Sequence, residues 1–380
     1  MNKVKSVPFN IPYLTGKETE YIINAVNSHQ ISGNGKYTKK CHELLQDKYG
    51  FRQCFLTTSC TDALEMCAIL LNIKPGDEVI VPSFTFVSTA NAFVLRGAKI
   101  IFADSEPNHP NIDADKIEEL ITHNTKAIAA VHYAGVACDM DKIMSLAEKH
   151  NIYVVEDAAQ AIDSYYKGRP LGGIGHLGTF SFHETKNIIS GEGGMLVIND
   201  ERFVKRAEII WEKGTNRAAF WRGEVDKYNW IDIGSSFLPS EMIAAFLFAQ
   251  LENIEGIQKK RKSIWQAYNT QLIDLANKGI LKLPELPDYC TNNAHMFYLL
   301  CNSEEERNSL LKHLNANGIN AVFHYLPLSD SPFFKENNWS IPLPNSIKFS
   351  QAIVRLPFYY QLSKSEIEFI CQMIIEFYDQ

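Results

Sequence analysis

Apolar and polar positions along the chain follow two different rhythms. Between residues 54 and 199, short apolar runs rich in β-branched residues alternate with stretches whose apolar positions have a helical period. This alternation predicts an α/β fold, in which helices cover both faces of a mostly parallel sheet. Seven strands are expected, at residues 54–57, 78–81, 99–102, 126–132, 152–156, 179–183 and 195–198. Helices are expected between them at residues 62–71, 85–95, 113–121 and 141–150.

After residue 200 the pattern changes to longer helical stretches. One helix is expected at residues 201–213, and a charged helical stretch at 240–275 could connect two domains. A smaller α+β domain follows, with strands expected at 296–301 and 321–325, helices at 304–317 and 364–378, and a proline-rich loop at 327–344. A length of 380 residues is typical of about two domains. We therefore predict a large domain over residues 1–240 and a smaller one over 241–380.

Composition excludes several classes of protein. The chain is 46% hydrophobic and 21% charged, and its net charge of -7 without a block of basic residues argues against binding to nucleic acid or anionic lipid. Pro8 and Pro12 precede any apolar run long enough for a signal peptide, and no run approaches the ~18 residues of a membrane helix. The eight cysteines have neither C-x-x-C pairs nor framework spacing, so they indicate reduced thiols, no metal site and a cytoplasmic protein.

Two glycine-rich segments could suggest ligand binding. Residues 173–178 match the pattern G-x-G-x-x-G of dinucleotide sites, but an expected strand follows them where that motif requires a helix. We interpret this segment as a glycine-rich connection. The segment Gly33-Asn34-Gly35 is expected to be a loop, although its position near the start of the chain would also allow contact with a substrate.

Asp157 and Lys186 are the most informative polar residues. Asp157 directly follows the apolar run at 152–156, and Lys186 lies in a glycine-rich turn after the expected strand at 179–183. The carboxyl ends of parallel strands are where α/β proteins bind ligands. Singly, such an aspartate is more often a helix cap and such a lysine more often solvated. Together they suggest pyridoxal 5'-phosphate (PLP), whose aldehyde forms an imine with a lysine and whose pyridine nitrogen is kept protonated by an aspartate.

PLP also needs a phosphate site and a contact for its ring. Residues 57–64 lead from a strand through small hydroxyl residues into a helix, whose first amides can face a dianion. Helix capping by Ser59 or Thr61 is compatible with that role. Phe84 and Phe86 follow another strand, and either could pack on the ring or belong to the core.

Long, ordered runs in this sequence resemble those of the DegT/StrS-type sugar aminotransferases. They include PFNIPYLTGKE, TTSCTDALEMCAILL, VVEDAAQA, GTFSFHETKNIISGEGGML and FHYLPL, and the resemblance covers nearly the whole chain. It implies an aspartate-aminotransferase-like fold (PLP fold type I), with a seven-stranded mostly parallel sheet and a smaller C-terminal α+β domain. It also implies a homodimer with shared active sites.

Within that family, the sequence most resembles the branch that acts on dTDP-4-dehydro-6-deoxy-D-glucose. That branch aminates C4 with L-glutamate as donor, giving a dTDP-4-amino-4,6-dideoxyhexose for surface polysaccharide such as the O-antigen of lipopolysaccharide. A C3-specific enzyme, an enzyme of UDP-linked sugars and a catalytically silent binding protein are the alternatives.

The resemblance also implies roles for individual residues. Lys186 is implied as the catalytic lysine that moves protons, and Asp157 as the partner of the pyridine nitrogen. The other implied cofactor contacts are Ser59, Cys60, Phe86, Gln160, Ser181 and, from the neighbouring subunit, Ser236. The implied substrate contacts are Phe9, Tyr13, His183, Glu184, His324 and Tyr325.

The sequence departs from the family pattern at two places. Where many members have G-Y-N-Y-R, with an amide side chain that reaches the neighbouring subunit's cofactor phosphate, residues 234–238 are GSSFL, so Ser235 or Ser236 would replace that amide. The familiar H-Y-x-P-L-H motif ends here in Ser329, so any substrate contact of its second histidine is absent. Lys186 is retained where dehydrating relatives have histidine, which favours amino transfer.

Overall fold

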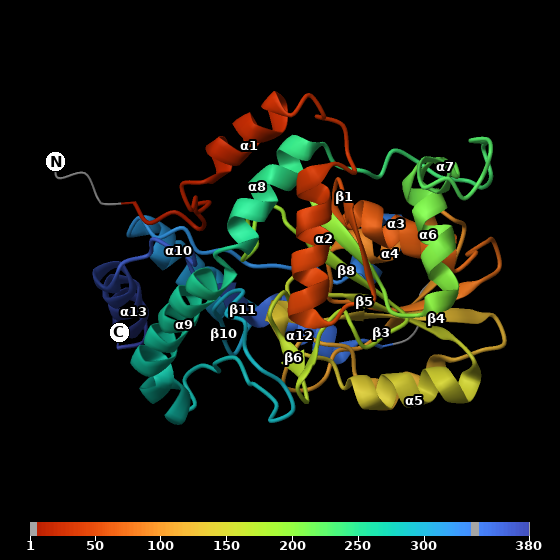
Figure 1. Cartoon of the computed structure of the whole chain (residues 1–380). Coiled ribbons are helices and arrows are strands. Elements are labelled where there is room, and N and C mark those ends of the chain that lie inside the picture. Colours follow the sequence, from red (N-terminus) through yellow and green to blue (C-terminus); the bar gives the residue numbers. More distant parts are fainter. Residues whose placement is uncertain (1–5, 336–341, 380) are drawn as a thin grey trace.

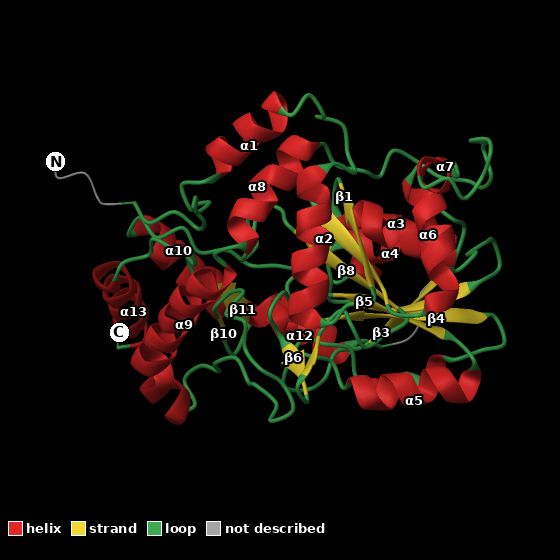
Figure 2. Cartoon of the chain, viewed as in Figure 1, coloured by secondary structure: helices red, strands yellow, loops and turns green. Residues whose placement is uncertain are grey.

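The computed structural model of the chain describes residues 6–335 and 342–379. Its centre is a seven-stranded sheet of order β1-β9-β8-β5-β4-β2-β3 (Figure 2). The strands are β1 (Gln53–Thr57), β2 (Glu78–Pro82), β3 (Lys99–Ala103), β4 (Thr125–Val131), β5 (Tyr153–Asp157), β8 (Leu177–Ser181) and β9 (Gly194–Ile198). All seven strands expected from the sequence are confirmed, because each buried strand is a continuous apolar run that ends at polar or glycine residues.

Strand β9 is the one strand of this sheet that runs against its neighbours. It pairs antiparallel with β1 and β8, whereas β8, β5, β4, β2 and β3 pair in parallel. Gly194, the first residue of β9, therefore lies opposite both Thr57 and Ser181, the last residues of β1 and β8. The reversal brings the start of one strand to the edge where the other strands end.

Helices cover both faces of the sheet (Figure 1). One face packs against α2 (Lys36–Tyr49), α5 (Met140–His150) and α8 (Glu241–Leu251), and α1 (Glu18–Asn27) packs on α8. The other face packs against α3 (Cys60–Leu70), α4 (Val87–Val94) and α6 (Val204–Trp211), and the short α7 (Arg217–Trp221) contacts α6. Side chains of β2 alternate between the faces, since Ile80 is in the first core and its neighbours Val79 and Val81 are in the second.

The C-terminal part of the chain has its own apolar core. The helices and strands of this C-terminal part are α9 (Ile254–Asn277), β10 (Tyr298–Leu300), α10 (Glu304–Ala316), α11 (Pro332–Lys335), α12 (Pro344–Ala352), β11 (Ile353–Arg355) and α13 (Lys364–Tyr378). Figure 1 shows α9, α10 and α13 grouped at the end of the molecule away from α6 and α7. Val7 joins this core from the start of the chain, because its amide donates to the carbonyl of Gly318 at 2.9 Å. The division into domains at residue 240 stays a prediction.

Several expected elements differ from those observed. The stretch at 240–275 is two helices, α8 and α9, and the break comes where α8 ends its packing against α1 and α2. Residues 113–121 form two short 3-10 turns, Ala114–Lys116 and Glu118–Leu120, in place of an α-helix. Residues 321–325 form no strand, because Val322 makes only an isolated bridge to Arg355. The expected loop at 327–344 contains α11, and its residues 336–341 lie outside the described part of the chain. The hairpin of β6 (Tyr165–Tyr166) and β7 (Arg169–Pro170) was not expected.

The two glycine-rich segments have structural explanations. The amides of Gly172, Ile174 and Gly175 donate to the buried Glu156 carboxylate at 2.9, 2.6 and 2.6 Å, so the turn at 173–178 is wound around a carboxylate of the protein itself. Gly35 donates its amide to Glu241 at 2.9 Å. Both segments thus donate backbone amides to a carboxylate of the protein itself, and a substrate contact of the segment at 33–35 stays untested. Within the described ranges, the helices are all too short or too polar to cross a membrane.

Candidate active site

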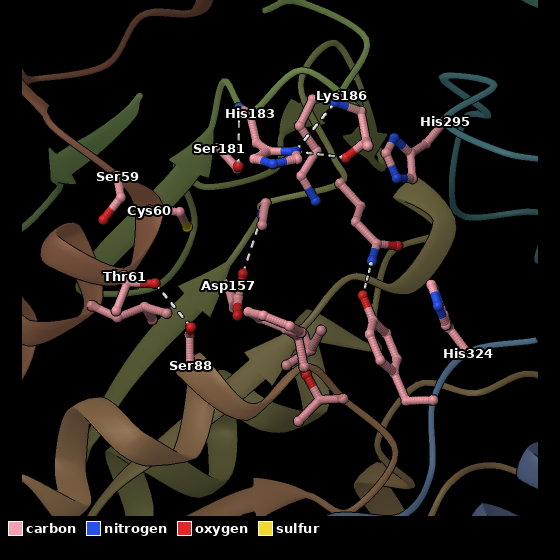
Figure 3. Close-up of a pocket in the computed structure, with 18 of the residues that line it drawn as sticks. Ser59, Cys60, Thr61, Ser88, Asp157, Ser181, His183, Lys186, His295 and His324 are labelled. Atoms are coloured by element: carbon pink, nitrogen blue, oxygen red, sulfur yellow. Dashed lines mark hydrogen bonds between the residues drawn. The ribbon is translucent and has the colours of Figure 1, made fainter. Parts of the chain in front are cut away.

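A cavity of about 750 Å³ lies at the carboxyl ends of the central strands. Its walls come from β5, the turn after β8, the first turns of α3 and α4, β11, and the segment with His324 and Tyr325 that follows α10 (Figure 3). The residues with sequence-implied roles that line it are Phe9, Ser59, Cys60, Phe86, Asp157, Gln160, Ser181, His183, Lys186, His324 and Tyr325. Eleven of the fourteen implied residues, which are far apart in the sequence, thus meet in one space.

Lys186 enters this cavity from the turn that follows β8. The turn is closed by backbone hydrogen bonds from Lys186 to His183 at 2.9 Å and from Ser190 to Phe182 at 2.7 Å. Burial lowers the pKa of the Lys186 amine, and the positive charge of Arg355 acts in the same direction. The neutral amine, which is the nucleophilic form, is therefore favoured at lower pH than in an exposed lysine. Figure 3 shows Lys186 and Asp157 projecting into the cavity from two walls.

Asp157 is the last residue of β5, and hydrogen bonds fix its carboxylate. Oδ2 accepts a hydrogen bond of 2.7 Å from the Thr89 hydroxyl, and Oδ1 accepts one of 3.1 Å from the amide of Ala159. The side chain is only 6% exposed. An acceptor-only group held at the end of a central strand suits a cationic or N–H partner inside the cavity.

The start of α3 forms a second wall, and the first amides of this helix face away from its own hydrogen-bonding pattern. Ser59 caps this helix by accepting from the amide of Asp62 at 3.1 Å, and the amides of Cys60 and Thr61 have no acceptor inside the helix because no turn precedes them. Gly194 lies directly beneath, because a Cβ there would be 2.3 Å from the Ser59 carbonyl carbon and 2.4 Å from the Cys60 nitrogen. This wall fits an anion held by backbone amides.

Phe86 and Phe84 have different environments. Phe84 is 1% exposed and packs against Tyr133 in the core, whereas Phe86 is 55% exposed at the cavity wall. The Phe86 ring lies 6.0 Å from that of Tyr325, measured between centroids. Phe86 is therefore the ring available to a planar ligand.

Gln160 connects the sheet to the segment that follows α10. Its Oε1 accepts from the amide of Ala134 at 2.6 Å, and its Nε2 donates to the Tyr325 hydroxyl at 3.3 Å. Tyr325 is 165 positions away in the sequence. This bond fixes the orientation of a side-chain amide at the edge of the cavity.

A sequence profile of the DegT/DnrJ/EryC1/StrS aminotransferase family matches residues 12–375. The chain belongs to this family. It is 32% identical over 379 residues to the GDP-perosamine synthase of Escherichia coli O157:H7, covering 99% of each chain. It also resembles an aminotransferase structure from Psychrobacter cryohalolentis with a TM-score of 0.92 and 27% identity, over 98% of this chain and 99% of the other. The PLP form of Spr1654 from Streptococcus pneumoniae gives a TM-score of 0.90 and 26% identity, over 98% and 99%.

The protein is therefore a PLP-dependent sugar aminotransferase, as its sequence predicts. PLP, when bound, supplies the electron-accepting ring that amino transfer requires. The cavity of the aminotransferase fits this cofactor, because the amides at the start of α3 suit its phosphate, Asp157 suits its pyridine nitrogen, Phe86 suits its ring face and Lys186 supplies the amine. The role of each residue stays a prediction.

Three residues with implied roles lie outside this cavity. Tyr13 stacks on Tyr360 with 3.7 Å between ring centroids, and Glu184 is exposed; both border a narrow hollow on another side of Lys186. Ser236 is exposed, and its backbone makes a bridge to Glu212. None of the three contributes to the wall of the main cavity of its own chain. The contact implied for Ser236 is with the neighbouring subunit, so it stays a prediction, as do the substrate contacts implied for Tyr13 and Glu184.

Sequence reasoning missed Arg355, His295 and Thr89. Arg355 and His295 line the cavity, and Thr89 holds Asp157. An arginine inside the apolar run at 353–358 was a signal that could have identified Arg355. His295 Nδ1 lies 2.9 Å from Asn187 Oδ1 and burial holds the pKa of the imidazole well below its usual range, so the ring is neutral. Nothing local in the sequence distinguished His295 or Thr89 from core residues.

Proposed function

We propose that the enzyme transfers the amino group of L-glutamate to C4 of dTDP-4-dehydro-6-deoxy-D-glucose, giving a dTDP-4-amino-4,6-dideoxyhexose for bacterial surface polysaccharide. The observation that carries amino transfer is the position of Lys186 opposite Asp157 in one cavity, beside the first amides of α3. The choice of sugar rests on the run-by-run resemblance to the C4 branch of the family.

Lys186 would act as the proton carrier of this reaction. Its lowered pKa makes a neutral Nζ available to take a proton from the α-carbon of the donor and to deliver one to C4 of the sugar. Asp157 would hold a proton on the cofactor's ring nitrogen, and Gln160 and Tyr325 would border the ring. Which sugar face is turned to Lys186 decides whether the new amine is equatorial or axial.

The nucleotide is the point at which the alternatives differ most. The E. coli relative is named GDP-perosamine synthase, so a GDP-linked sugar competes with the dTDP-linked one. UDP-linked sugars and C3-keto isomers are further candidates. We favour dTDP because several runs of the sequence together resemble the branch that acts on dTDP-linked sugars. This agreement over many runs carries more weight than any single residue.

The decisive experiment measures amino transfer with L-glutamate and four acceptors. These are the dTDP-, GDP- and UDP-linked 4-keto-6-deoxyhexoses and the C3-keto isomer of the dTDP sugar, and the product of each is identified by NMR. The highest kcat/KM is expected for the dTDP-linked C4-keto sugar. A preference for the GDP sugar would replace the nucleotide assignment, and a preference for the C3-keto isomer would replace the position of the new amine.

We also propose a homodimer in which Ser236 reaches the partner's cofactor phosphate. The support is that Ser236 is exposed and lies outside the cavity of its own chain. Mixed dimers test this. Ser236→Trp and Lys186→Ala proteins should each be nearly inactive, but re-associated mixtures should regain activity, because one of the two sites is then intact. Ser263→Trp, at an exposed serine of α9, is the control and should keep its activity. Absence of recovery would contradict a shared site.

A further inference from the structure

Arg355 is a cation in the cavity, and it has no acidic partner among the residues that the structure describes. It ends β11 and lines the same space as Lys186. Its Nε is buried without a hydrogen-bond partner in the part of the chain that the structure describes. The carboxylates in the cavity wall are Asp157, which is bound by Thr89 and Ala159, and Glu192, which lies 3.7 Å from His183. A guanidinium is always charged, so an unpaired one at a cavity wall favours binding of an anion.

His324 adds a second donor without adding negative charge. Its Nδ1 lies 2.9 Å from Nη1 of Arg355, and since a guanidinium only donates, Nδ1 accepts and the ring proton is on Nε2. Partial burial and the charge of Arg355 lower the pKa of His324, which keeps the imidazole neutral. Arg355 and His324 therefore form a wall of hydrogen-bond donors.

Phe9 lies beside the guanidinium of Arg355. Its ring centre lies 5.1 Å from the Arg355 guanidinium carbon, and its carbonyl accepts from the amide of Phe358 at 3.1 Å. One side of the guanidinium is thus covered by an aromatic ring, and the N–H groups that do not bind His324 remain as donors for a planar, two-oxygen anion.

We propose that Arg355, positioned by His324 and Phe9, binds the α-carboxylate of the amino donor. This inference rests on the proposed amino transfer from an α-amino acid. Such a donor has its carboxylate on the same carbon as the amine, so the carboxylate must lie close to the reacting nitrogen and hence within the cavity of Lys186. The phosphates of a nucleotide sugar are separated from C4 by the sugar ring and would lie farther from Lys186. Arg355 therefore distinguishes the donor from the sugar in a cavity that both must use.

The test compares Arg355→Lys and Arg355→Met with wild type in the two half-reactions, each followed by the absorbance of the cofactor. Arg355→Met should raise the half-saturating concentration of L-glutamate about 10- to 100-fold, because a charge-assisted hydrogen bond is lost. Arg355→Lys should retain the charge but lose the paired geometry and give a smaller increase. The half-saturating concentration of the nucleotide sugar should stay near the wild-type value.

Binding without turnover gives an independent measurement. Glutarate has the two carboxylates of glutamate but no amine, so its binding to cofactor-free protein, measured by calorimetry, does not depend on amino transfer. Wild type should bind glutarate, and Arg355→Met should bind it at least about tenfold more weakly.

Arg307→Met is the matched control. Arg307 is also in the C-terminal part and packs over an aromatic ring, 4.3 Å from the centre of Phe323, but it does not line the cavity. It should leave both half-saturating concentrations unchanged. The proposal is overturned if Arg307→Met has the same effect as Arg355→Met, if Arg355→Met weakens the sugar and not glutamate, or if it weakens neither. If wild type accepts a different α-amino acid, the proposed donor is wrong, and the same comparison with that donor still decides the role of Arg355.

Discussion

The hydroxyl of Thr89 donates a hydrogen bond of 2.7 Å to the carboxylate of Asp157, although the two residues are 68 positions apart. A threonine hydroxyl has one proton, which this bond uses. The contact of 3.0 Å between the Thr85 and Thr89 hydroxyls must therefore have Thr85 as its donor. Thr89 in the first turn of α4 thus orients the carboxylate at the end of β5, and Thr85, just before this helix, binds the Thr89 hydroxyl. This relationship can be tested directly.

Thr89→Val should weaken PLP binding and lower kcat about tenfold, because the valine keeps the shape of threonine but leaves one oxygen of Asp157 without its donor. Thr89→Ser should keep most of the PLP affinity and most of the wild-type kcat, because serine retains the hydroxyl donor. Asp157→Asn should cost more than Thr89→Val, since a neutral amide holds no proton on the ring nitrogen. Cofactor titration and steady-state rates provide the measurement. Equal values for Thr89→Val and wild type would show that this hydrogen bond does not matter for function.

Lys186→Ala should abolish turnover and remove the absorbance band at about 400 nm that a lysine-bound cofactor gives, while the fold stays intact. The reason is that Lys186 is the lysine that lines the cavity, so its amine is the one that can form the imine with the cofactor. Lys278→Ala, at an exposed lysine that follows α9, is the control and should leave both unchanged. If Lys186→Ala keeps more than a few per cent of the wild-type rate, the catalytic assignment is wrong.

Gly194→Ala should disrupt the start of α3. The new Cβ would lie 2.3 Å from the backbone of Ser59, so the strand and the helix must separate. We expect a loss of about 1–3 kcal/mol in the free energy of unfolding, together with weaker PLP binding. Gly256→Ala is the opposite control, because Gly256 lies in α9 with open space around it, and it should stabilise the protein by about 0.5–1 kcal/mol. Chemical denaturation measures the unfolding free energy of both variants. A Gly194→Ala protein as stable as wild type would show that β9 and the start of α3 can move apart at little cost.

Acid should destabilise the cofactor-free protein through His42. Its Nε2 accepts from the amide of Leu56 at 2.9 Å, and burial lowers the pKa of His42 to about 3. The unfolded chain, in which a histidine has a pKa of about 6.5, binds one more proton between these values, so stability is fully present above about pH 6.5 and falls as the pH is lowered towards 3.

The slope from this residue is at most about 1.4 kcal/mol per pH unit. His42→Gln should reduce the dependence of unfolding free energy on pH in that range. Denaturation curves at several pH values measure it. An unchanged slope in His42→Gln would assign the acid sensitivity to other groups.

The sequence by itself determined the central sheet and the two residues on which the cofactor assignment rests. Buried strands are continuous apolar runs, and polar residues mark their carboxyl ends, so seven strands and the positions of Asp157 and Lys186 could be predicted locally. The turn at 173–178 was also interpreted correctly, because a strand follows it where a nucleotide motif needs a helix. These features depend on neighbours in the sequence.

Only the tertiary structure decided which residues share the cavity. Contacts between distant segments decide that Phe86 and not Phe84 lines the cavity and that Thr89 binds Asp157. They also place Arg355 of β11 in the cavity wall. The break between α8 and α9 was likewise visible only in the structure, where α8 packs against α1 and α2 and α9 packs against α13. The apolar run at 353–358 marks Arg355 as unusual, but a local pattern does not encode such contacts, because a buried threonine or arginine has the same short-range sequence signal whether it packs in a core or faces a ligand.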